Sequence, residues 1–438
     1  MSVEHRTVDT LILGAGLAGL SAAFHLGECA EIYESQSYVG GKARTESHQG
    51  FTFDVTGHWL HLRDEAIRQW ILTLLGEDHF LKITRKSRVW SHGVYTQYPY
   101  QANTYGLPAN VIKSCVLGAI EADRRRSAET SSQEPESFSD WIRYYFGDGI
   151  AEHFMLPYNA KLWGVSADQI TSRWCQRFVP KPDLEDIVAG AVGCNAEGMG
   201  YNAQFLYPKS GGIQTVASAI GSAVGSDRIH LNQKAVQIDP DGKTVTFESG
   251  VTVTYQRLIS TIPLPGLIDR MVGVTKAAQE ARSLLRANEV IYLNVGIDGT
   301  LGETDHWIYV PEEKWPVYRV GSFSNANPAM APADCGSLYI ELSDRETPVE
   351  TLRPQIEAML VEMNLIADPQ QIRFMQTRRI PNAYVIYDFN YHESRHTILS
   401  YLEDVGIKSI GRYGDWNYSS MEDALLDGKR MAEASSWL

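Results

Sequence analysis

Near its start the chain reads Gly14-Ala15-Gly16-Leu17-Ala18-Gly19. The apolar run before it, residues 8–13, predicts a strand, and the small-residue run after it, residues 17–26, predicts a helix. The glycines permit a tight turn, close backbone approach to a pyrophosphate and close packing of helix on strand, while the helix N-terminus favours negative charge. The segment therefore predicts the opening of a dinucleotide-binding fold.

An acidic residue at the right distance strengthens this interpretation. Glu31-Ile32-Tyr33 predicts a second strand, and Glu34 follows it directly. A carboxylate at this position can accept hydrogen bonds from an adenosine ribose. The alternative is a glycine-rich turn that binds nothing, and the fingerprint alone leaves NAD and FAD both open.

The next segments carry a resemblance that favours FAD over NAD. Gly40-Gly41-Lys42 is followed by Asp54-Val55-Thr56-Gly57-His58. Here the chain resembles the amine-oxidase-like flavoprotein superfamily, in which the paired glycines pass near the cofactor pyrophosphate and the Gly-His turn lies against the isoalloxazine. Gly411 to Ala424 resembles the closing flavin turn of that superfamily. The residues expected to bind FAD are Gly14, Gly16, Leu17, Ala18, Gly19, Glu34, Gly41, Lys42, Gly57, Ala235, Arg412 and Met421.

Composition excludes several other functions. The formal net charge of −14 over 438 residues argues against a binder of nucleic acid or of anionic membranes. No apolar run reaches the roughly 18 to 20 residues of a membrane span, and no signal peptide is evident, so we expect a cytoplasmic protein without membrane insertion. The five cysteines include no Cys-x-x-Cys pair, and His58 with His61 lacks a third ligand, so no metal site is expected.

The patterns along the chain predict an α/β fold of three parts. Helical patterns dominate the middle of the chain, and strand-like patterns dominate after residue 285. We expect a Rossmann-like FAD-binding domain with an inserted helical domain and a substrate-side, mostly antiparallel sheet. The expected division is 1–79, 205–265 and 405–438 for the FAD-binding domain, 104–204 for the helical domain, and 80–103 with 266–404 for the substrate-binding sheet domain.

Three segments of the middle of the chain narrow the family. They read Gln97-Tyr98-Pro99-Tyr100-Gln101, Phe154 to Trp163, and Tyr201-Asn202-Ala203-Gln204-Phe205. In order and spacing, over nearly the whole chain, the sequence resembles the eukaryotic-type UDP-galactopyranose mutases. These enzymes interconvert the pyranose and furanose forms of a nucleotide sugar.

This resemblance implies a set of substrate-binding residues. Arg177 and Arg319 match diphosphate-binding arginines, and two guanidinium forks suit a pyrophosphate. Taken singly, such arginines are more often surface ion pairs, and aromatic clusters are more often core. The residues expected to bind substrate are Tyr100, Gln101, Phe154, Tyr158, Asn159, Trp163, Arg177, Asn202, Tyr309, Arg319, Tyr384 and Tyr418.

The function implied is a redox-neutral mutase acting on a nucleotide sugar. Reduced FAD, with NAD(P)H as a candidate reductant, attacks the anomeric carbon through N5, and the nucleoside diphosphate leaves and returns. The catalytic residues expected are His58, Arg177 and Arg319. The chain departs from the family pattern at Thr56, where the mutases have glycine, and at Leu156, where they have arginine. The sugar and the oligomeric state stay open, and the alternatives are an FAD oxidase or desaturase, or a flavin-binding protein without catalysis.

Overall fold

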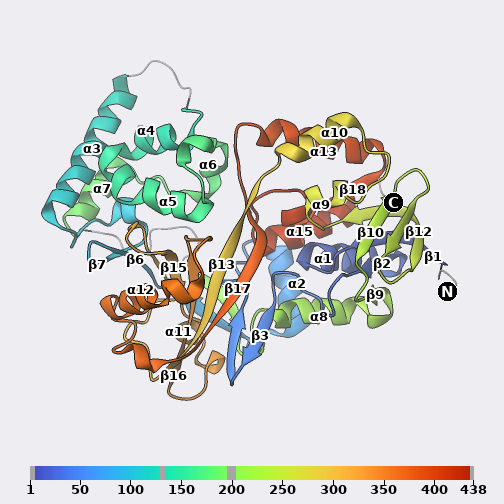
Figure 1. Cartoon of the computed structure of the whole chain (residues 1–438), viewed down its shortest axis with the longest axis horizontal. Coiled ribbons are helices and arrows are strands. Elements are labelled where there is room, and N and C mark those ends of the chain that lie inside the picture. Colours follow the sequence, from blue (N-terminus) through green and yellow to red (C-terminus); the bar gives the residue numbers. More distant parts are fainter. Residues whose placement is uncertain (1–4, 129–133, 195–203, 435–438) are drawn as a thin grey trace.

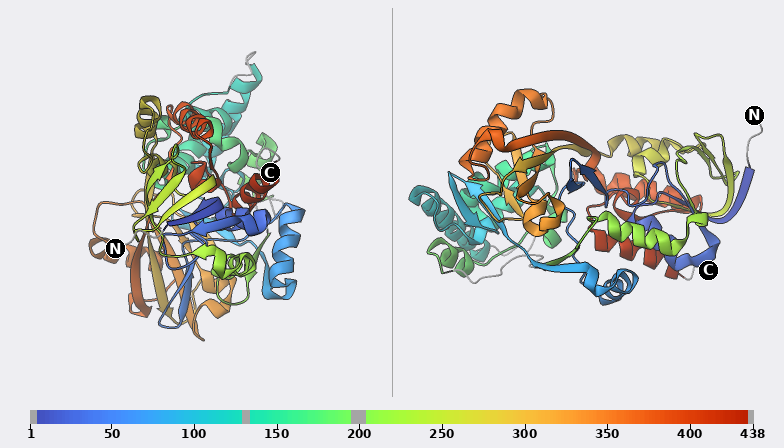
Figure 2. Two further views of the ribbon diagram at one scale, coloured as in Figure 1. Left: turned by 90° about the vertical axis from the view of Figure 1, so that its right-hand side faces the viewer. Right: turned by 90° about the horizontal axis from the view of Figure 1, so that it is seen from below.

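The computed structural model describes residues 5–128, 134–194 and 204–434. Two large sheets and a group of helices make up the chain (Figure 1). The predicted fold class is confirmed: a Rossmann-like domain, an inserted helical domain and a mostly antiparallel sheet are all present. Seen from below, the Rossmann-like sheet and both termini lie at one end, and the helical domain and second sheet lie at the other (Figure 2).

The first sheet has seven strands and a mainly parallel centre, in the order β10-β11-β12-β1-β2-β9 with β18 beside β12. Its strands are β1 (His5–Leu13), β2 (Ala30–Tyr33), β9 (Ile229–His230), β10 (Ala235–Asp239), β11 (Thr244–Phe247), β12 (Thr252–Ser260) and β18 (Ile407–Ser409). β1 pairs in parallel with both β2 and β12. The predicted β-α-β opening is therefore present.

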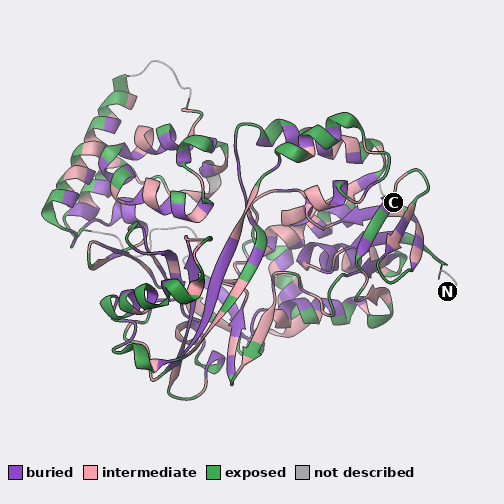
Figure 3. Cartoon of the chain, viewed as in Figure 1, coloured by how far each residue is buried: buried purple, intermediate pink, exposed green. Residues whose placement is uncertain are grey.

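Helices cover both faces of this sheet, because successive side chains of β1 point to opposite sides. The helices are α1 (Leu17–Leu26), α2 (Glu65–Leu75), α8 (Gln214–Val224), α9 (Leu264–Ile268), α10 (Lys276–Leu284), α13 (Tyr391–Asp404) and α15 (Met421–Glu433). Ile12 packs in the cluster with α1, α8 and α15, whereas Leu11 and Leu13 belong to the cluster that includes α9 and α13. Both clusters are buried (Figure 3).

The second sheet also has seven strands, in the order β17-β13-β16-β15-β14-β6-β7. They are β6 (Ser87–Ser91), β7 (Val94–Gln97), β13 (Ala287–Asp298), β14 (Trp307–Tyr309), β15 (Val317–Gly321), β16 (Cys335–Leu342) and β17 (Ile372–Val385). All pairings are antiparallel except that of β14 with β6. α11 (Phe323–Ala326) packs against β16, and α12 (Val349–Glu362) shares an apolar cluster with the inner strands.

The inserted domain is a bundle of helices around Phe138, Trp141 and Phe146. Its helices are α3 (Ala109–Ala128), α4 (Phe138–Ile150), α5 (Leu156–Trp163), α6 (Cys175–Phe178) and α7 (Leu184–Ala191). α3 and α4 cross closely because Gly149 has no side chain. A Cβ there would lie 2.3 Å from the carbonyl oxygen of Ser114.

Some elements lie away from the parts in which the expected boundaries put them. Two small sheets pair β3 (Thr45–His48) with β4 (Phe51–Asp54), and β5 (Phe80–Thr84) with β8 (Gln204–Pro208). β5 thus joins β8 rather than the seven-stranded substrate-side sheet. α10 packs on α13, and α13 contacts β18 of the first sheet. The chain therefore also crosses between the two parts at α10 and α13, and the exact domain boundaries stay a prediction.

Candidate active site

The glycine turn combines tight packing at two glycines with open space at the third. Gly14 adopts a φ of +101°, and its amide donates to the carbonyl of Tyr33 at 2.9 Å. A Cβ on Gly19 would lie 2.0 Å from the carbonyl oxygen of Gly14, so only glycine fits. A Cβ on Gly16 would meet nothing within 4 Å. The first turn of α1, including Leu17 and Ala18, therefore begins beside free space, which fits an anionic group.

Glu34 anchors this turn from the end of β2. Its buried carboxylate accepts a hydrogen bond from the amide of Ala15 at 2.7 Å through Oε2 and from the amide of Gln36 at 2.8 Å through Oε1. Oε1 also accepts from the hydroxyl of Ser35 at 3.0 Å, so Oε2 is the oxygen that can accept a further bond. The hydrogen bond from Ala15 to Glu34 holds the glycine turn in place. Ribose binding by Glu34 stays a prediction.

The paired glycines and the last helix close around the same region. Gly41 approaches Gly16 so closely that a Cβ on Gly41 would lie 3.2 Å from the Cα of Gly16. α15 packs on α1 through Gly428, where a Cβ would lie 2.5 Å from the carbonyl oxygen of Ala18. Both helices follow parallel strands, β1 and β18, so their N-termini lie at the same edge of the sheet. Met421 is the first residue of α15.

The turn before His58 has two unusual features. Thr56 adopts a φ of +58°, a conformation that β-branched residues rarely adopt. Gly57 has no room for a side chain, because a Cβ would lie 2.4 Å from the hydroxyl of Tyr339. Nδ1 of His58 is buried without a hydrogen-bond partner in the described part of the chain. A buried nitrogen without a partner fits the wall of a site in which a bound cofactor supplies the missing hydrogen bond.

Burial also sets the charge of His58. Desolvation lowers its pKa to about 4, and the positive charges of Arg412 and Lys42 act in the same direction. The imidazole is therefore uncharged near pH 7, and in that form it can donate or accept a hydrogen bond. Burial lowers the pKa of Lys42 as well.

Arg412 contacts two aromatic residues, Tyr384 at the end of β17 and Tyr418 before α15. Its guanidinium donates to the carbonyls of Ser419 at 2.8 Å and Ala383 at 2.9 Å. It also lies over the rings of Tyr418, 4.6 Å from the centroid, and Tyr384, at 5.5 Å. Contact between Arg412 and FAD stays a prediction, as does that of Ala235, which is buried at the start of β10.

A cavity of about 310 Å³ lies between the helical domain and the second sheet. Gly57 lines it, so it reaches the turn before His58. The expected substrate residues that line it are Gln101, Phe154, Tyr158, Asn159, Trp163, Tyr309, Arg319, Tyr384 and Tyr418. Segments far apart in the sequence thus meet around one space.

Arg319 is held by a buried carboxylate that the sequence did not single out. Its Nε and Nη2 donate to Oε2 of Glu341 at 3.1 and 2.7 Å, and Nη2 also donates to the hydroxyl of Tyr384 at 2.9 Å. The Glu341 side chain is 2% exposed and that of Arg319 22%. In the described part of the chain Nη1 has no partner, which leaves one arm of the fork for a ligand.

Stacked aromatic rings form much of the wall. Tyr309 stacks on Tyr98 with centroids 4.8 Å apart and meets the edge of Tyr158 at 5.3 Å. Phe154 is stacked between Tyr158, at 5.4 Å, and Tyr100, at 4.8 Å. Tyr100 is fully buried and does not line the cavity. Its position supports Phe154 rather than facing a ligand.

Two side-chain amides, those of Gln101 and Asn159, line the cavity. Gln101 donates through Nε2 to the carbonyl of Pro180 at 2.8 Å, and its Oε1 is buried without a partner among the described residues. Asn159 accepts from Nε1 of Trp163 at 3.3 Å and donates to the carbonyl of Met155 at 2.7 Å. Gln101 therefore offers a fixed acceptor to a ligand group with an N–H.

Two expected substrate residues cannot be placed in this cavity. The backbone of Arg177 belongs to α6, but its side chain lies outside the described part of the chain, and so does the whole of Asn202. Their roles stay predictions. The cavity also has walls that the sequence analysis missed, including Arg85, Tyr98 and Trp307. Tyr98 stood inside a quoted segment, whereas no spacing distinguishes Arg85, which lies 4.9 Å over the Tyr98 ring.

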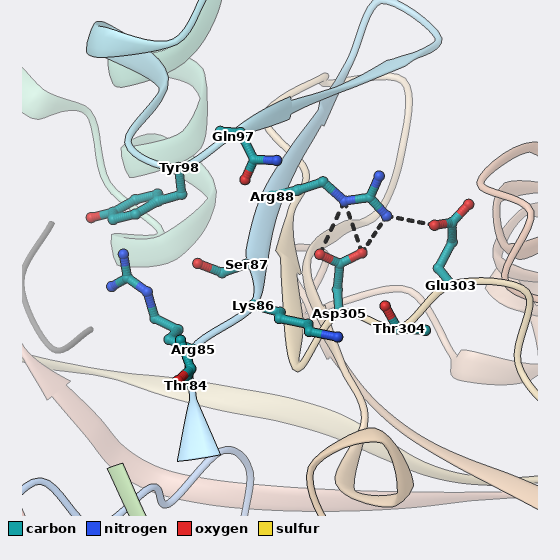
Figure 4. Close-up of a pocket in the computed structure, with 10 residues that line it drawn as sticks. All are labelled: Thr84, Arg85, Lys86, Ser87, Arg88, Gln97, Tyr98, Glu303, Thr304 and Asp305. Carbon is teal, nitrogen blue, oxygen red and sulfur yellow. Dashed lines mark hydrogen bonds and ion pairs between the residues drawn. The ribbon is translucent and has the colours of Figure 1, made fainter. Parts of the chain in front are cut away.

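A second, more polar hollow of about 450 Å³ adjoins the first and shares Arg85 and Tyr98 with it (Figure 4). Figure 4 shows the guanidinium of Arg88 turned toward two carboxylates. Its Nε donates to Oδ2 of Asp305 at 2.9 Å, and its Nη2 to Oε2 of Glu303 at 2.5 Å. Arg88 is thus paired with two carboxylates, whereas Arg319 is paired with one.

The residues that the structure describes contain neither a cluster of metal-ligating side chains nor a membrane-spanning helix. No three His, Cys, Asp or Glu side chains are close enough together to hold a metal ion. His61 instead shares a hydrogen bond of 3.0 Å with the carbonyl of Gln204. No helix in the same residues combines the length and the apolar character needed to cross a membrane.

Comparison with known proteins identifies the class. Residues 17–434 match the family of flavin-containing amine oxidoreductases, and the chain belongs to that family. It is therefore a flavoprotein of the amine-oxidase superfamily, and the open space at Gly16, the anchored Glu34 and the unpartnered Nδ1 of His58 fit a bound FAD.

The individual similar proteins are of two kinds, a mutase and oxidases. The crystal structure of a reduced UDP-galactopyranose mutase is similar with a TM-score of 0.91 and 27% identity, over 97% of this chain and 95% of that one. A protein named as a flavin-containing monoamine oxidase, AofH of Mycobacterium tuberculosis, is 25% identical over 272 residues. That match spans 57% of this chain and only 54% of AofH. Putrescine oxidase, with a TM-score of 0.68 and 19% identity over 98% of this chain and 99% of that one, shares the fold.

Proposed function

We propose that this protein is a flavin-dependent mutase of the eukaryotic UDP-galactopyranose mutase type, which interconverts pyranose and furanose forms of a nucleotide sugar. The observation that carries the proposal is the free arm of Arg319 in a cavity that also reaches Gly57. Tyr309, Tyr384 and Tyr418 line the same cavity. The likeness to a reduced UDP-galactopyranose mutase over nearly the whole chain supports it.

The residues of the cavity suit the departure and return of a diphosphate. Reduced FAD, when bound, supplies a nucleophile for the anomeric carbon. As the bond from that carbon to the diphosphate breaks, negative charge grows on the phosphate oxygens, and Nη1 of Arg319 can donate to them. Burial raises the pKa of Tyr384 to about 12, so its hydroxyl keeps its proton and stays a hydrogen-bond donor at neutral pH.

Glu341 gives Arg319 a fixed orientation. The two residues are direct cross-strand neighbours on β15 and β16, and two of the guanidinium nitrogens are bound to one carboxylate oxygen. The fork therefore does not have to be ordered when a ligand arrives, which reduces the entropic cost of binding. The carboxylate also offsets the charge of Arg319, so the diphosphate can leave the site as well as enter it.

The aromatic rings and Gln101 suit the nucleoside part. Tyr158 offers the ring face that is turned away from Phe154, on which a base can stack, and the unpartnered Oε1 of Gln101 can accept from a base N–H. The base, the sugar and NAD(P)H as reductant are parts of the same proposal. His58, being neutral, contributes a hydrogen-bonding group beside the flavin rather than a charge.

An FAD-dependent amine oxidase is the second candidate, favoured by the name of the M. tuberculosis relative. Its substrate would be a cationic amine held between aromatic rings. In this chain the guanidinium of Arg412 already lies 4.6 Å from the centroid of the Tyr418 ring, and Arg319 adjoins Tyr384. The Tyr418 ring therefore already carries a guanidinium, and the positive charge of Arg412 is unfavourable for an ammonium ion at the same ring.

Anaerobic assay of the flavoprotein separates the two candidates. The protein is reduced with dithionite and mixed with UDP-galactopyranose or other nucleotide sugars, and products are separated by chromatography. A furanose product, with the flavin still reduced at the end, is expected. If turnover of an amine requires oxygen and releases peroxide while no nucleotide sugar reacts, the mutase proposal is wrong. Arg379→Ala, at an exposed arginine paired with Glu289, is the matched surface control for substitution of Arg319 by alanine.

A further inference from the structure

Lys161 is a buried lysine whose side chain ends on backbone carbonyls. It is 9% exposed and lies on α5. Its Nζ donates to the carbonyls of Val310 at 3.1 Å and Val317 at 2.9 Å, and also to that of Glu312. Three acceptors for one ammonium group is the full complement of hydrogen bonds that it can donate.

The partners of Lys161 belong to the other wall of the substrate cavity. Val310, Glu312 and Val317 lie at or between the ends of β14 and β15, the two strands that carry Tyr309 and Arg319. α5 carries the facing residues of the cavity, among them Tyr158 and Trp163. The Lys161 side chain therefore joins the two walls directly. Among the described residues, Lys161 is the lysine whose hydrogen bonds join α5 to this connection.

We propose that Lys161 is a positioning residue of the substrate cavity: its ammonium group fixes the spacing between α5 and the β14–β15 connection at which Tyr158, Tyr309 and Arg319 face one ligand. The inference deepens the proposed function, because that ligand is the nucleotide sugar. The segment after β16 also holds this helix, because Nη2 of Arg345 donates to the carbonyls of Lys161 and Leu162, each at 3.1 Å.

The protonated form of Lys161 is the one that can make this tie. A neutral amine has two protons and a lone pair, so it leaves at least one of the three carbonyls unpaired. Burial lowers the pKa of Lys161 to about 7, and the carboxylates of Glu312 and Glu313 oppose that shift. The hydrogen bonds from Lys161 to the three carbonyls should therefore weaken as the pH rises through the physiological range.

The titration of other charged groups near Lys161 has to be distinguished from that of Lys161 itself. On the sheet side these are Glu312 and Glu313, together with His92, whose backbone amide donates to Oε1 of Glu312 at 3.1 Å. On the helical side His153 lies with its ring 5.3 Å from that of His92, and burial lowers the pKa of His153. Arg345 keeps its charge throughout the relevant range. His92 is thus the one neighbour that needs its own control.

The groups nearest the ligand titrate elsewhere. Burial lowers the pKa of both His58 and His61 to about 4. It raises that of Tyr384 to about 12. Burial lowers the pKa of Lys161 to about 7, which lies between these limits. Loss of affinity in that range therefore reports on Lys161.

The first test measures the affinity of the wild-type holoprotein for UDP-galactopyranose by tryptophan fluorescence. If only the protonated form is competent, the dissociation constant should rise about tenfold from about pH 6 to about pH 8. Binding that is independent of pH would overturn the inference but not the proposed function, whereas absence of binding at every pH contradicts the proposed function.

The global stability should change with pH in the opposite direction to the affinity. Because the pKa of Lys161 is lower in the folded protein, the unfolded chain binds more protons above about pH 7, and this group makes the free energy of unfolding rise with pH.

The second test needs no ligand and uses hydrogen exchange of the ligand-free holoprotein. After correction for intrinsic rates, amides of α5 should be less protected at about pH 8 than at about pH 6, because the tie is open in a fraction of molecules set by the Lys161 pKa. Equal protection at both pH values would overturn the inference even if no nucleotide sugar binds.

Variants complete the test. Lys161→Met, which cannot donate, should show weak affinity and low α5 protection at both pH values. Lys161→Arg should bind with an affinity that no longer falls with pH. His92→Asn, at a position with a φ of +54° that asparagine tolerates, should keep the wild-type pH dependence. Lys113→Met, at an exposed lysine of α3, is the matched control for the methionine change. A pH dependence that persists in Lys161→Met would contradict the assignment.

Discussion

Arg319 faces Glu341 across two neighbouring strands, and this pairing determines what a substitution at either residue should do. Arg319→Ala should weaken nucleotide-sugar binding by about 1.5 to 3 kcal/mol, the usual range for charged hydrogen bonds, and leave FAD bound. It also leaves the buried carboxylate of Glu341 without its cation, which should lower stability. Calorimetric titration with UDP-galactopyranose and the flavin spectrum provide the two readouts.

The double variant Arg319→Ala, Glu341→Gln separates these effects. Removing the carboxylate charge should recover much of the lost stability but none of the lost affinity. If the single variant binds the nucleotide sugar as tightly as the wild type, Arg319 is not the diphosphate contact.

Thr56 supplies a second prediction about a single residue. Its φ of +58° is costly for a β-branched side chain and free for glycine. Thr56→Gly should therefore stabilise the protein by about 1 kcal/mol, since relief of strain exceeds the extra entropy of the unfolded glycine. Thr52→Gly, in the adjoining strand β4, is the control and should destabilise, because glycine weakens strand interiors. Urea unfolding of both variants gives the comparison, and destabilisation by Thr56→Gly would refute the strain argument.

At the level of secondary structure, the approach of α15 to α1 should control flavin binding. Gly428→Ala puts a methyl group 2.5 Å from the Ala18 carbonyl oxygen and 2.6 Å from the amide of Ala22, and rigid backbone cannot yield. The helix must shift, at a cost of about 1 to 3 kcal/mol, and its N-terminus at Met421 moves with it. FAD retention after gel filtration should fall.

Gly221→Ala provides the matched control for that change. It places the same methyl group on α8, where its nearest neighbours lie at ordinary contact distances of 3.4 to 3.8 Å. It should leave FAD bound and raise stability by up to about 1 kcal/mol through helix propensity. Equal FAD retention in the two variants would show that the α1–α15 contact does not position the cofactor site.

Elements with a strong local signal were predictable from sequence. The expected helix at residues 17–26 is α1, and the expected strand at 8–13 is the inner part of β1 (His5–Leu13). Their signals are local, namely apolar runs bounded by glycines. The pairing of Arg319 with Glu341 was not predictable, because it depends on the register between β15 and β16. Lys161 was missed for the same reason, since its partners lie about 150 residues away.

At the level of the whole molecule, the substrate cavity exists only because the helical insertion packs against the second sheet. Residues on α5, β14, β15 and β17 meet there, and Gly57 brings the first sheet's cofactor region to the same space. Sequence motifs identified most of these residues, but not that Tyr100 would lie behind Phe154 rather than in the cavity. Which side of a ring faces a ligand depends on packing between separate parts of the chain.

The proposed reaction has one requirement that oxidation of an amine does not share: the bond between the anomeric carbon and the diphosphate must break and form again. Positional isotope exchange measures this step directly. UDP-galactopyranose labelled with ¹⁸O in the bond between the anomeric carbon and the β-phosphorus is incubated with the dithionite-reduced protein and examined by ³¹P NMR. The account predicts that the label spreads to the non-bridging β-phosphate oxygens with reduced flavin and stays in place with oxidised flavin. A label that stays in the bridge while the reduced protein binds the nucleotide sugar would contradict it.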